Sequence, residues 1–129
     1  MKPALVIILL LSTLVMGKDN QHPYLDSSLP VEARIDDLLS RMTLEEKVGQ
    51  LNMPCVYEGG LGRSIEEKMQ GVKTFAAGTQ VEGLGPGGGF FTLPNTILHN
   101  GTEQQVEFIN ELQRIAIEET RLGIPLLLT

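Results

Sequence analysis

The chain has 129 residues, of which 42% are hydrophobic, so it has room for one modest domain with a packed core. Its formal net charge of −6 disfavours nucleic acid as a partner, because nucleic-acid binding requires a basic surface. The single cysteine, Cys55, excludes a disulfide framework and a cysteine-based metal cluster, and it is interpreted as a small core residue. The sequence predicts neither a metal site nor a cofactor.

The first 17 residues have the pattern of a secretory signal peptide. Lys2 is followed by an apolar run from 4 to 16, and Val15 and Gly17 are small enough for a cleavage site after Gly17. The run is shorter than the roughly 18 residues that a membrane-spanning helix needs. A membrane anchor is therefore the less favoured alternative. We expect a mature chain of residues 18–129 that is extracellular or periplasmic and free of the membrane, with a possible N-glycosylation site at Asn100.

Two features predict the first three helices. Apolar residues at helical spacing indicate an amphipathic helix over 30–42. Thr43 with Glu46, and Ser64 with Glu67, match the capping-box pattern that begins a helix. The second helix is therefore expected to follow the first with only a turn between them. Gly71 is expected to interrupt the third helix or mark its end.

A final helix is expected to begin at Thr102, again with a glutamine three residues later. Arg121 suits the negative end of its dipole, Gly123 suits the left-handed C′ position, and Pro125 prevents its continuation. Its apolar face is expected to contain Phe108, Ile109, Leu112, Ile115 and Ala116.

The apolar run at 124–128 does not alternate with polar residues, which is typical of a strand covered on both faces in a parallel sheet. Such a strand needs neighbours, because its backbone groups must be paired. Two weaker strand candidates are residues 51–57, where Pro54 disfavours a strand, and a short segment near Phe90. The pattern of helices and strands predicts an α/β fold.

The segment GLGPGG matches the G-x-G-x-x-G pattern through Gly83, Gly85 and Gly88. Dinucleotide binding also requires a helix N-terminus directly after the glycines, and no helix signal follows before Thr102. We therefore favour a tight loop whose backbone adopts positive φ or approaches a neighbouring segment closely.

Other candidate groups do not form a catalytic or metal-binding pattern. His22 and His99 lack partners at ligand spacing, and metal, redox and serine-hydrolase motifs are missing from the sequence. The adjacent carboxylates are expected to lie on solvated helix faces or in first turns rather than to form an acid–base pair. These are Asp36/Asp37, Glu45/Glu46, Glu66/Glu67 and Glu118/Glu119.

The segment 24–51 resembles the opening of family 3 glycoside hydrolases, the secreted β-glucosidase and β-xylosidase group. The resemblance is strongest in RIDDLLSRMTLEEKVGQL at 34–51. The segment EFINELQRIAIEETRLGIPLLLT at 107–129 resembles the next part of the same family, and residues 56–100 are less diagnostic. The resemblance covers almost the whole mature chain.

This resemblance implies a (β/α)8 barrel, of which residues 18–129 would form an incomplete N-terminal portion. It also implies a carbohydrate substrate and retaining hydrolysis of β-glucosides or β-xylosides by a nucleophile and an acid/base residue. Both residues would lie beyond residue 129, so we assign no catalytic or substrate-binding residue and expect the fragment alone to be inactive. Arg63 is the one candidate to reach a pocket, although a surface arginine is favoured.

The alternative hypothesis is a short secreted module that retains the beginning of the fold without catalysis. Such a module would act through sugar contact or association with a partner. The sequence does not specify the oligomeric state or the sugar.

Overall fold

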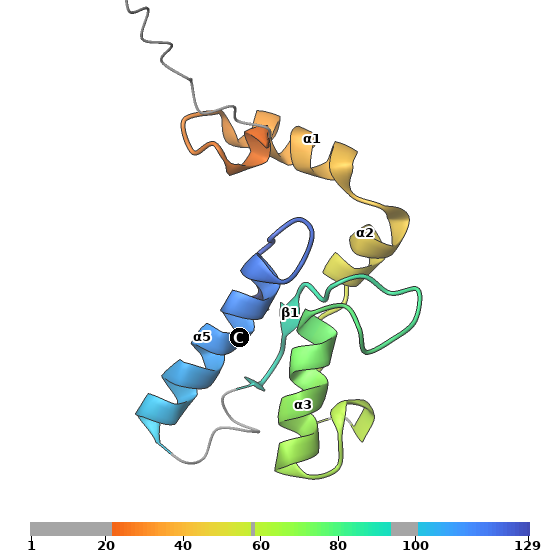
Figure 1. Cartoon of the computed structure of the whole chain (residues 1–129), viewed down its shortest axis with the longest axis vertical. Coiled ribbons are helices and arrows are strands. Elements are labelled where there is room, and N and C mark those ends of the chain that lie inside the picture. Colours follow the sequence, from red (N-terminus) through yellow and green to blue (C-terminus); the bar gives the residue numbers. More distant parts are fainter. Residues whose placement is uncertain (1–21, 58, 94–100) are drawn as a thin grey trace, which may run out of the picture.

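The computed structural model describes residues 22–57, 59–93 and 101–129 (Figure 1). The signal-peptide cleavage site, His99 and Asn100 lie outside these residues. Along the chain the elements are η1 (Pro23–Leu25), α1 (Val31–Arg41), α2 (Leu44–Gln50), η2 (Gly59–Leu61), α3 (Ile65–Ala76), β1 (Gly89–Phe90), α5 (Thr102–Glu118) and β2 (Leu127–Leu128).

Both predicted capping boxes are confirmed. The Thr43 hydroxyl accepts a hydrogen bond from the Glu46 N–H at 3.2 Å, and the Glu46 carboxylate accepts one from the Thr43 N–H at 2.9 Å. Ser64 and Glu67 form the same reciprocal pair at the start of α3. Each pair satisfies backbone donors that the first turn of a helix leaves unpaired. Local side-chain chemistry therefore explains why α2 and α3 begin at these positions.

The prediction that Gly71 interrupts α3 or marks its end is wrong, because α3 continues through it to Ala76. The glycine is needed there for a tertiary contact. A Cβ atom at this position would lie 2.0 Å from the carbonyl oxygen of Leu61 in η2. The missing side chain allows η2 to pack directly on the backbone of α3.

The final helix begins at Thr102 as predicted, but its end differs from the prediction. Gly101 is the N-cap and no side chain caps the helix, so Thr102 does not act as a cap. The helix ends at Glu118, before the glycine that was expected at its C′ position. Gly123 does adopt a positive φ of 60°, in a separate turn where its N–H donates to the Thr120 hydroxyl at 3.2 Å.

The sheet is parallel and follows the chain order. β1 pairs with β2 in a register that places Gly89 opposite Leu127, and a single parallel bridge joins Cys55 to Phe91 on the other side of β1. The chain forms α3 between the Cys55 segment and β1, and it forms α5 between β1 and β2. The helices and this short parallel sheet are compatible with the predicted α/β class, although the segment that contains Pro54 contributes only the one bridge.

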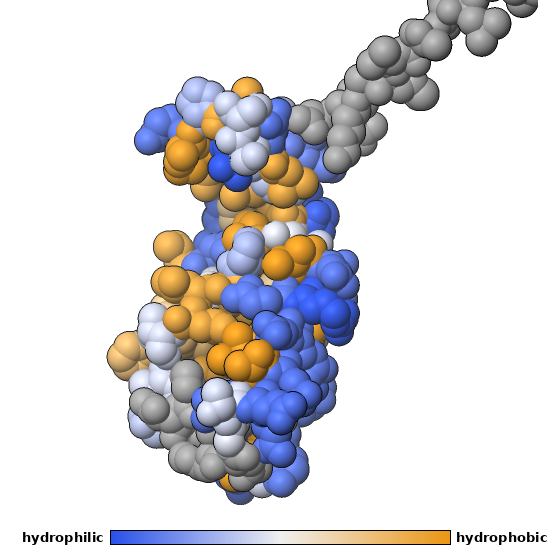
Figure 2. Space-filling model, turned by 90° about the vertical axis from the view of Figure 1, so that its left-hand side faces the viewer, coloured by the Kyte–Doolittle hydropathy of each residue, from blue (hydrophilic) through white to orange (hydrophobic). Residues whose placement is uncertain are grey.

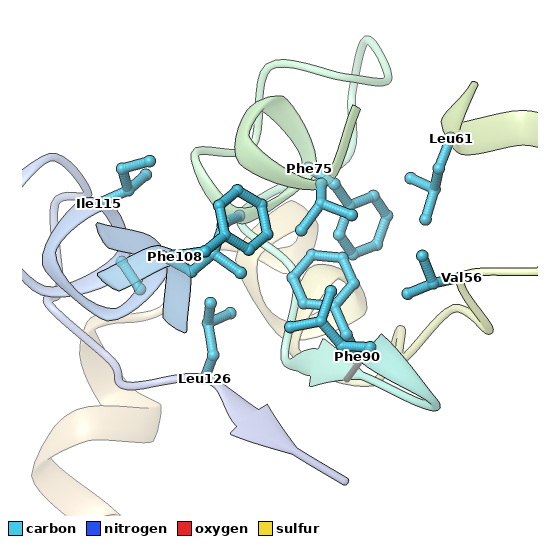
Figure 3. Close-up of a cluster of buried hydrophobic side chains, with 12 residues drawn as sticks. Val56, Leu61, Phe75, Phe90, Phe108, Ile115 and Leu126 are labelled. Carbon is cyan, nitrogen blue, oxygen red and sulfur yellow. The ribbon is translucent and has the colours of Figure 1, made fainter. Parts of the chain in front are cut away.

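The core lies between the sheet and the helices α3 and α5 (Figure 3). Phe75 and Phe90 meet edge to face, with ring centroids 5.6 Å apart. The predicted face of α5 is confirmed, since all of its members are buried except Ile109, which is partly buried against the same core. The core cluster contains Val56, Leu61, Val72, Phe75, Ala76, Phe90, Leu93, Phe108, Leu112, Ile115, Ala116 and Leu126.

Only one face of the sheet is covered within the described residues. Phe90 and Leu126 point into the core and are 0% and 6% exposed, whereas Phe91 and Leu127 are 53% and 63% exposed. Successive strand residues point to opposite faces, so this alternation separates a packed face from an open one. The prediction that 124–128 is covered on both faces is therefore wrong for this chain.

Tyr24 connects the N-terminal elements to the end of the chain. Its hydroxyl donates to the Leu122 carbonyl at 2.9 Å, and its own carbonyl accepts from Arg34 Nε at 2.9 Å. Nevertheless, α1 buries no residue completely. In the part of the chain that the structure describes, no helix has the length and apolar character required to cross a membrane.

Candidate functional site

The carboxyl ends of the three parallel segments lie side by side and form the candidate site. The Val56 N–H donates to the Phe91 carbonyl at 3.2 Å. On the other side of β1, the Thr129 N–H donates to the Phe90 carbonyl at 3.2 Å, and the Thr92 N–H donates to the Thr129 carbonyl at 3.0 Å. Ligands of parallel α/β proteins bind outside the carboxyl ends of the strands. We therefore call this group of strand ends the carboxyl edge.

The carboxyl edge offers hydroxyl and thiol groups. The Thr92 hydroxyl donates to the Phe91 carbonyl at 2.6 Å, and the sulfur of Cys55 lies 3.3 Å from the same hydroxyl oxygen. Cys55 is only partly buried, which corrects its interpretation as a core residue. Tyr57 follows nearby in the chain and is 61% exposed. These groups can exchange hydrogen bonds with a polar ligand, but their side chains include no carboxylate to act as nucleophile or general acid.

Glu46 is structural rather than catalytic. The Arg121 guanidinium donates from Nε to Glu46 Oε1 at 2.9 Å and also donates to the Arg41 carbonyl at 2.8 Å. This guanidinium holds the pKa of the Glu46 carboxyl below its usual value. The Glu46 side chain is only 14% exposed, and it lies in the first turn of α2, one of the two places predicted for the adjacent acids. It links the start of α2 to the segment after α5.

Three further acids, Asp37, Glu45 and Glu67, have lowered pKa values. The Arg41 guanidinium lies 2.9 Å from Asp37 and lowers the pKa of that carboxyl, which is also partly covered rather than freely solvated. The Glu67 carboxylate accepts a hydrogen bond from the backbone N–H of Arg63 at 2.8 Å and another from the N–H of Ser64, the N-cap of α3. Both bonds lower the pKa of Glu67. A general acid at neutral pH needs a raised pKa. These acids are therefore suited to holding helices in place rather than to proton transfer.

The glycine-rich segment is a packing loop, which confirms the favoured interpretation. The Gly88 N–H donates to the Gly49 carbonyl, and the Gly85 N–H donates to the Glu45 carbonyl, both at 3.1 Å. Gly83 adopts a positive φ of 75°. The strand β1 follows these glycines directly, so the N-terminus of a helix is not present there to hold a pyrophosphate.

Arg63 is an exposed side chain, as favoured from the sequence. With Glu67, Thr74 and Gln80 it lines an open hollow of about 610 Å³ beside α3. None of the side chains of the carboxyl edge lines this hollow. His22 contacts Arg41 at 3.4 Å. Residues 22–57, 59–93 and 101–129 contain no group of three or more histidines, cysteines and acids that could hold a metal ion.

A second hollow, of about 420 Å³, is apolar and lies between α1, α2 and the segment before β2. Leu51 on its wall is 85% exposed. Figure 2 shows hydrophobic residues gathered over the middle of one face of the molecule and near its α1 end. The hollow is lined by Leu38, Leu39, Met42, Lys47, Gln50, Leu51 and Ile124.

The sequence did not predict the roles of three residues, Gln113, Arg121 and Thr92. The amide of Gln113 forms two hydrogen bonds with the backbone of Leu126, at 2.9 and 3.0 Å. Arg121 was expected to interact with a helix dipole, but it binds an acid 75 residues away. Thr92 adopts a positive φ of 64°. Local sequence carries no signal for such long-range pairs or for a threonine in this conformation.

Most of the chain is similar to known glycosidases. It is 40% identical over 117 residues to β-glucosidase C of Emericella nidulans, a match that covers 87% of this chain. It is 36% identical over 117 residues to probable β-glucosidase C of Aspergillus flavus, covering 84% of the chain. It is 36% identical over 107 residues to a periplasmic β-glucosidase/β-xylosidase of Dickeya chrysanthemi, covering 81%.

The chain spans only a small part of these relatives, namely 16% of each fungal protein and 15% of the bacterial one. No protein-family model matches it. The similarities confirm the resemblance to β-glucosidases and β-xylosidases that the sequence motifs predict.

Proposed function

We propose that this chain is the N-terminal part of a secreted family 3 glycoside hydrolase that cleaves β-glucosides or β-xylosides with retention. In this proposal residues 1–17 are the signal peptide, and residues 18–129 are the first part of a (β/α)8 barrel. The observation that carries the proposal is the identity of 36–40% to β-glucosidases over 84–87% of the chain.

The packing of the sheet supports a barrel. In a (β/α)8 barrel the helices cover the outside of the strands, and side chains from all strands pack in layers inside. Here α3 and α5 cover one face, while Phe91 and Leu127 remain exposed on the other. We propose that this open face is the barrel interior and that the remaining strands of the full-length enzyme cover it.

The side chains of the carboxyl edge suggest which part of the full-length enzyme binds the sugar and which part supplies the reacting carboxylates. Retaining hydrolysis needs two carboxyl groups about 5 Å apart, one as nucleophile and one as acid/base. In the part of the chain that the structure describes, the carboxyl edge presents the side chains of Cys55, Tyr57, Thr92 and Thr129 instead. We propose that this chain forms part of the sugar-pocket wall and that the reacting carboxylates come from the rest of the enzyme. The chain alone is then inactive.

The sequence pattern of the first 17 residues supports secretion. A relative from Dickeya chrysanthemi carries the name periplasmic β-glucosidase/β-xylosidase. We propose an extracytoplasmic location for the full-length protein.

A chimeric enzyme tests the proposal. Residues 18–129 replace the matching segment of Emericella nidulans β-glucosidase C, and hydrolysis of aryl β-glucosides and β-xylosides is measured. We expect turnover by the chimera and none by residues 18–129 alone. A matched control chimera carries Gly89→Leu, because any Cβ at this position would lie 2.0 Å from the Leu127 carbonyl oxygen and disrupt the sheet. A folded chimera without turnover, or turnover by the isolated chain, contradicts the proposal.

A further inference from the structure

Thr92 has an unusual backbone at the centre of the carboxyl edge. Among the described residues it is the one non-glycine residue with positive φ, at 64°. A branched Cβ makes this left-handed conformation unfavourable, and bulky or branched residues adopt it rarely. Strain of this kind persists only where the surroundings enforce it, and it is concentrated at functional sites.

The turn at Thr92 redirects the chain out of the strand. Phe90 is 0% exposed and Phe91 is 53% exposed, so continued alternation would place residue 93 on the open face. Leu93 is instead 0% exposed and belongs to the core. The left-handed residue therefore ends β1 and anchors the chain beyond it in the core.

Contacts from all three parallel segments meet at Thr92. Its N–H donates to the Thr129 carbonyl at 3.0 Å, and its hydroxyl donates to the Phe91 carbonyl at 2.6 Å. The sulfur of Cys55 lies 3.3 Å from the same hydroxyl. Thr92 is thus the residue that joins the carboxyl ends of β1, β2 and the bridged segment.

Glycine would adopt this backbone without strain, so the turn alone does not require threonine. What threonine adds is the hydroxyl, which bonds to the preceding carbonyl and contacts Cys55. These contacts hold the turn in the orientation that directs the Thr92 N–H at the carbonyl of Thr129, the residue directly after β2.

We infer that Thr92 is a positioning residue for sugar binding, and this inference rests on the proposed function. Its hydroxyl fixes the carboxyl ends of the strands relative to each other, so that the pocket wall is preformed for the sugar. Among the described residues, the edge carries hydrogen-bonding groups rather than carboxylate side chains. Losing the hydroxyl therefore affects sugar binding more than bond cleavage.

The test uses the chimeric enzyme with Thr92→Val, Thr92→Ser and Thr79→Val. Valine keeps the branched shape and removes the hydroxyl, whereas serine keeps the hydroxyl. Thr79 is an exposed threonine in the turn after α3 and serves as the matched control. Active enzyme is counted by trapping the glycosyl-enzyme with a 2-fluoro glycoside, so misfolded protein does not enter the rate constants.

We expect T92V to lower kcat/KM about tenfold, mainly through a higher KM, because one hydrogen-bonding hydroxyl is lost. T92S and T79V should stay within about threefold of the wild type. An active chimera in which T92V changes kcat/KM by less than about twofold, or loses only kcat, overturns the inference alone. T92S as impaired as T92V also overturns it. A wild-type chimera without turnover refutes the proposed function and, with it, this inference.

Discussion

Replacing Gly71 with alanine sets two known effects against each other. Alanine in place of a glycine inside a helix normally stabilises by about 0.5–1 kcal/mol, because glycine loses more backbone freedom on folding. Here the new Cβ would lie 2.0 Å from the carbonyl oxygen of Leu61, whereas real Cβ contacts essentially never fall below 3.0 Å. The obstacle is backbone, and the Leu61 side chain is 6% exposed within the core, so η2 cannot move without disturbing the packing.

The packing cost is the larger of the two effects. Overpacking a core costs about 1–3 kcal/mol, so G71A is expected to lower the free energy of unfolding by about 1–2 kcal/mol after the helix gain is subtracted. The assay is urea unfolding of residues 18–129, monitored by far-UV circular dichroism. Gly60→Ala is the matched control in η2, because a Cβ there meets no atom within 4 Å. We expect G60A to change stability by less than about 0.5 kcal/mol. A G71A protein as stable as the wild type, or more stable, would refute the reasoning.

Three further predictions concern stability and can be checked in the same unfolding assay. Phe90→Ala removes a ring that is 0% exposed and should cost about 3–5 kcal/mol; a loss below about 1 kcal/mol would contradict its central place in the core. Gln113→Ala leaves the N–H and carbonyl of Leu126 without their side-chain partner and should lower the free energy of unfolding by about 1–3 kcal/mol. Hydrogen exchange at the Leu126 amide should become faster, and unchanged exchange would count against the contact. Arg121 lowers the pKa of Glu46 in the folded state, so this carboxylate contributes stability above its unfolded pKa of roughly 4.3 and loses the contribution as pH falls through the folded value. The stability difference between wild type and Glu46→Gln should therefore shrink below about pH 4, and a difference that grows on acidification would show that the sign is wrong.

Features set by neighbouring residues were predicted well. The capping pairs at Thr43 and Ser64 satisfy backbone donors within one turn, so their chemistry is complete in a few residues. The apolar face of α5 follows from helical spacing, and the short strand at Phe90 was a weaker candidate in the sequence. The resemblance to glycosidases also depends on contiguous motifs, which is why it was visible from the sequence.

Features that depend on distant segments were not predictable. Gly71 looked like a helix breaker because local propensity disfavours it, but the approach of η2 makes glycine the residue that fits. The apolar run at 124–128 looked doubly covered because it lacks alternation, but helices cover only one face in the described residues. Thr92, with its positive φ, likewise contacts Cys55 and Thr129, which are distant in the chain.

The sequence by itself determined where the helices begin, which of their faces are apolar and which enzymes the chain resembles. Each of these depends on residues within a turn or two of one another, or on an unbroken motif. The tertiary structure alone decided that Arg121 binds Glu46, that Gln113 holds the backbone of Leu126, and that three strand ends meet at Thr92. Such contacts join residues far apart in the chain, and their geometry exists only once the helices and strands have packed together.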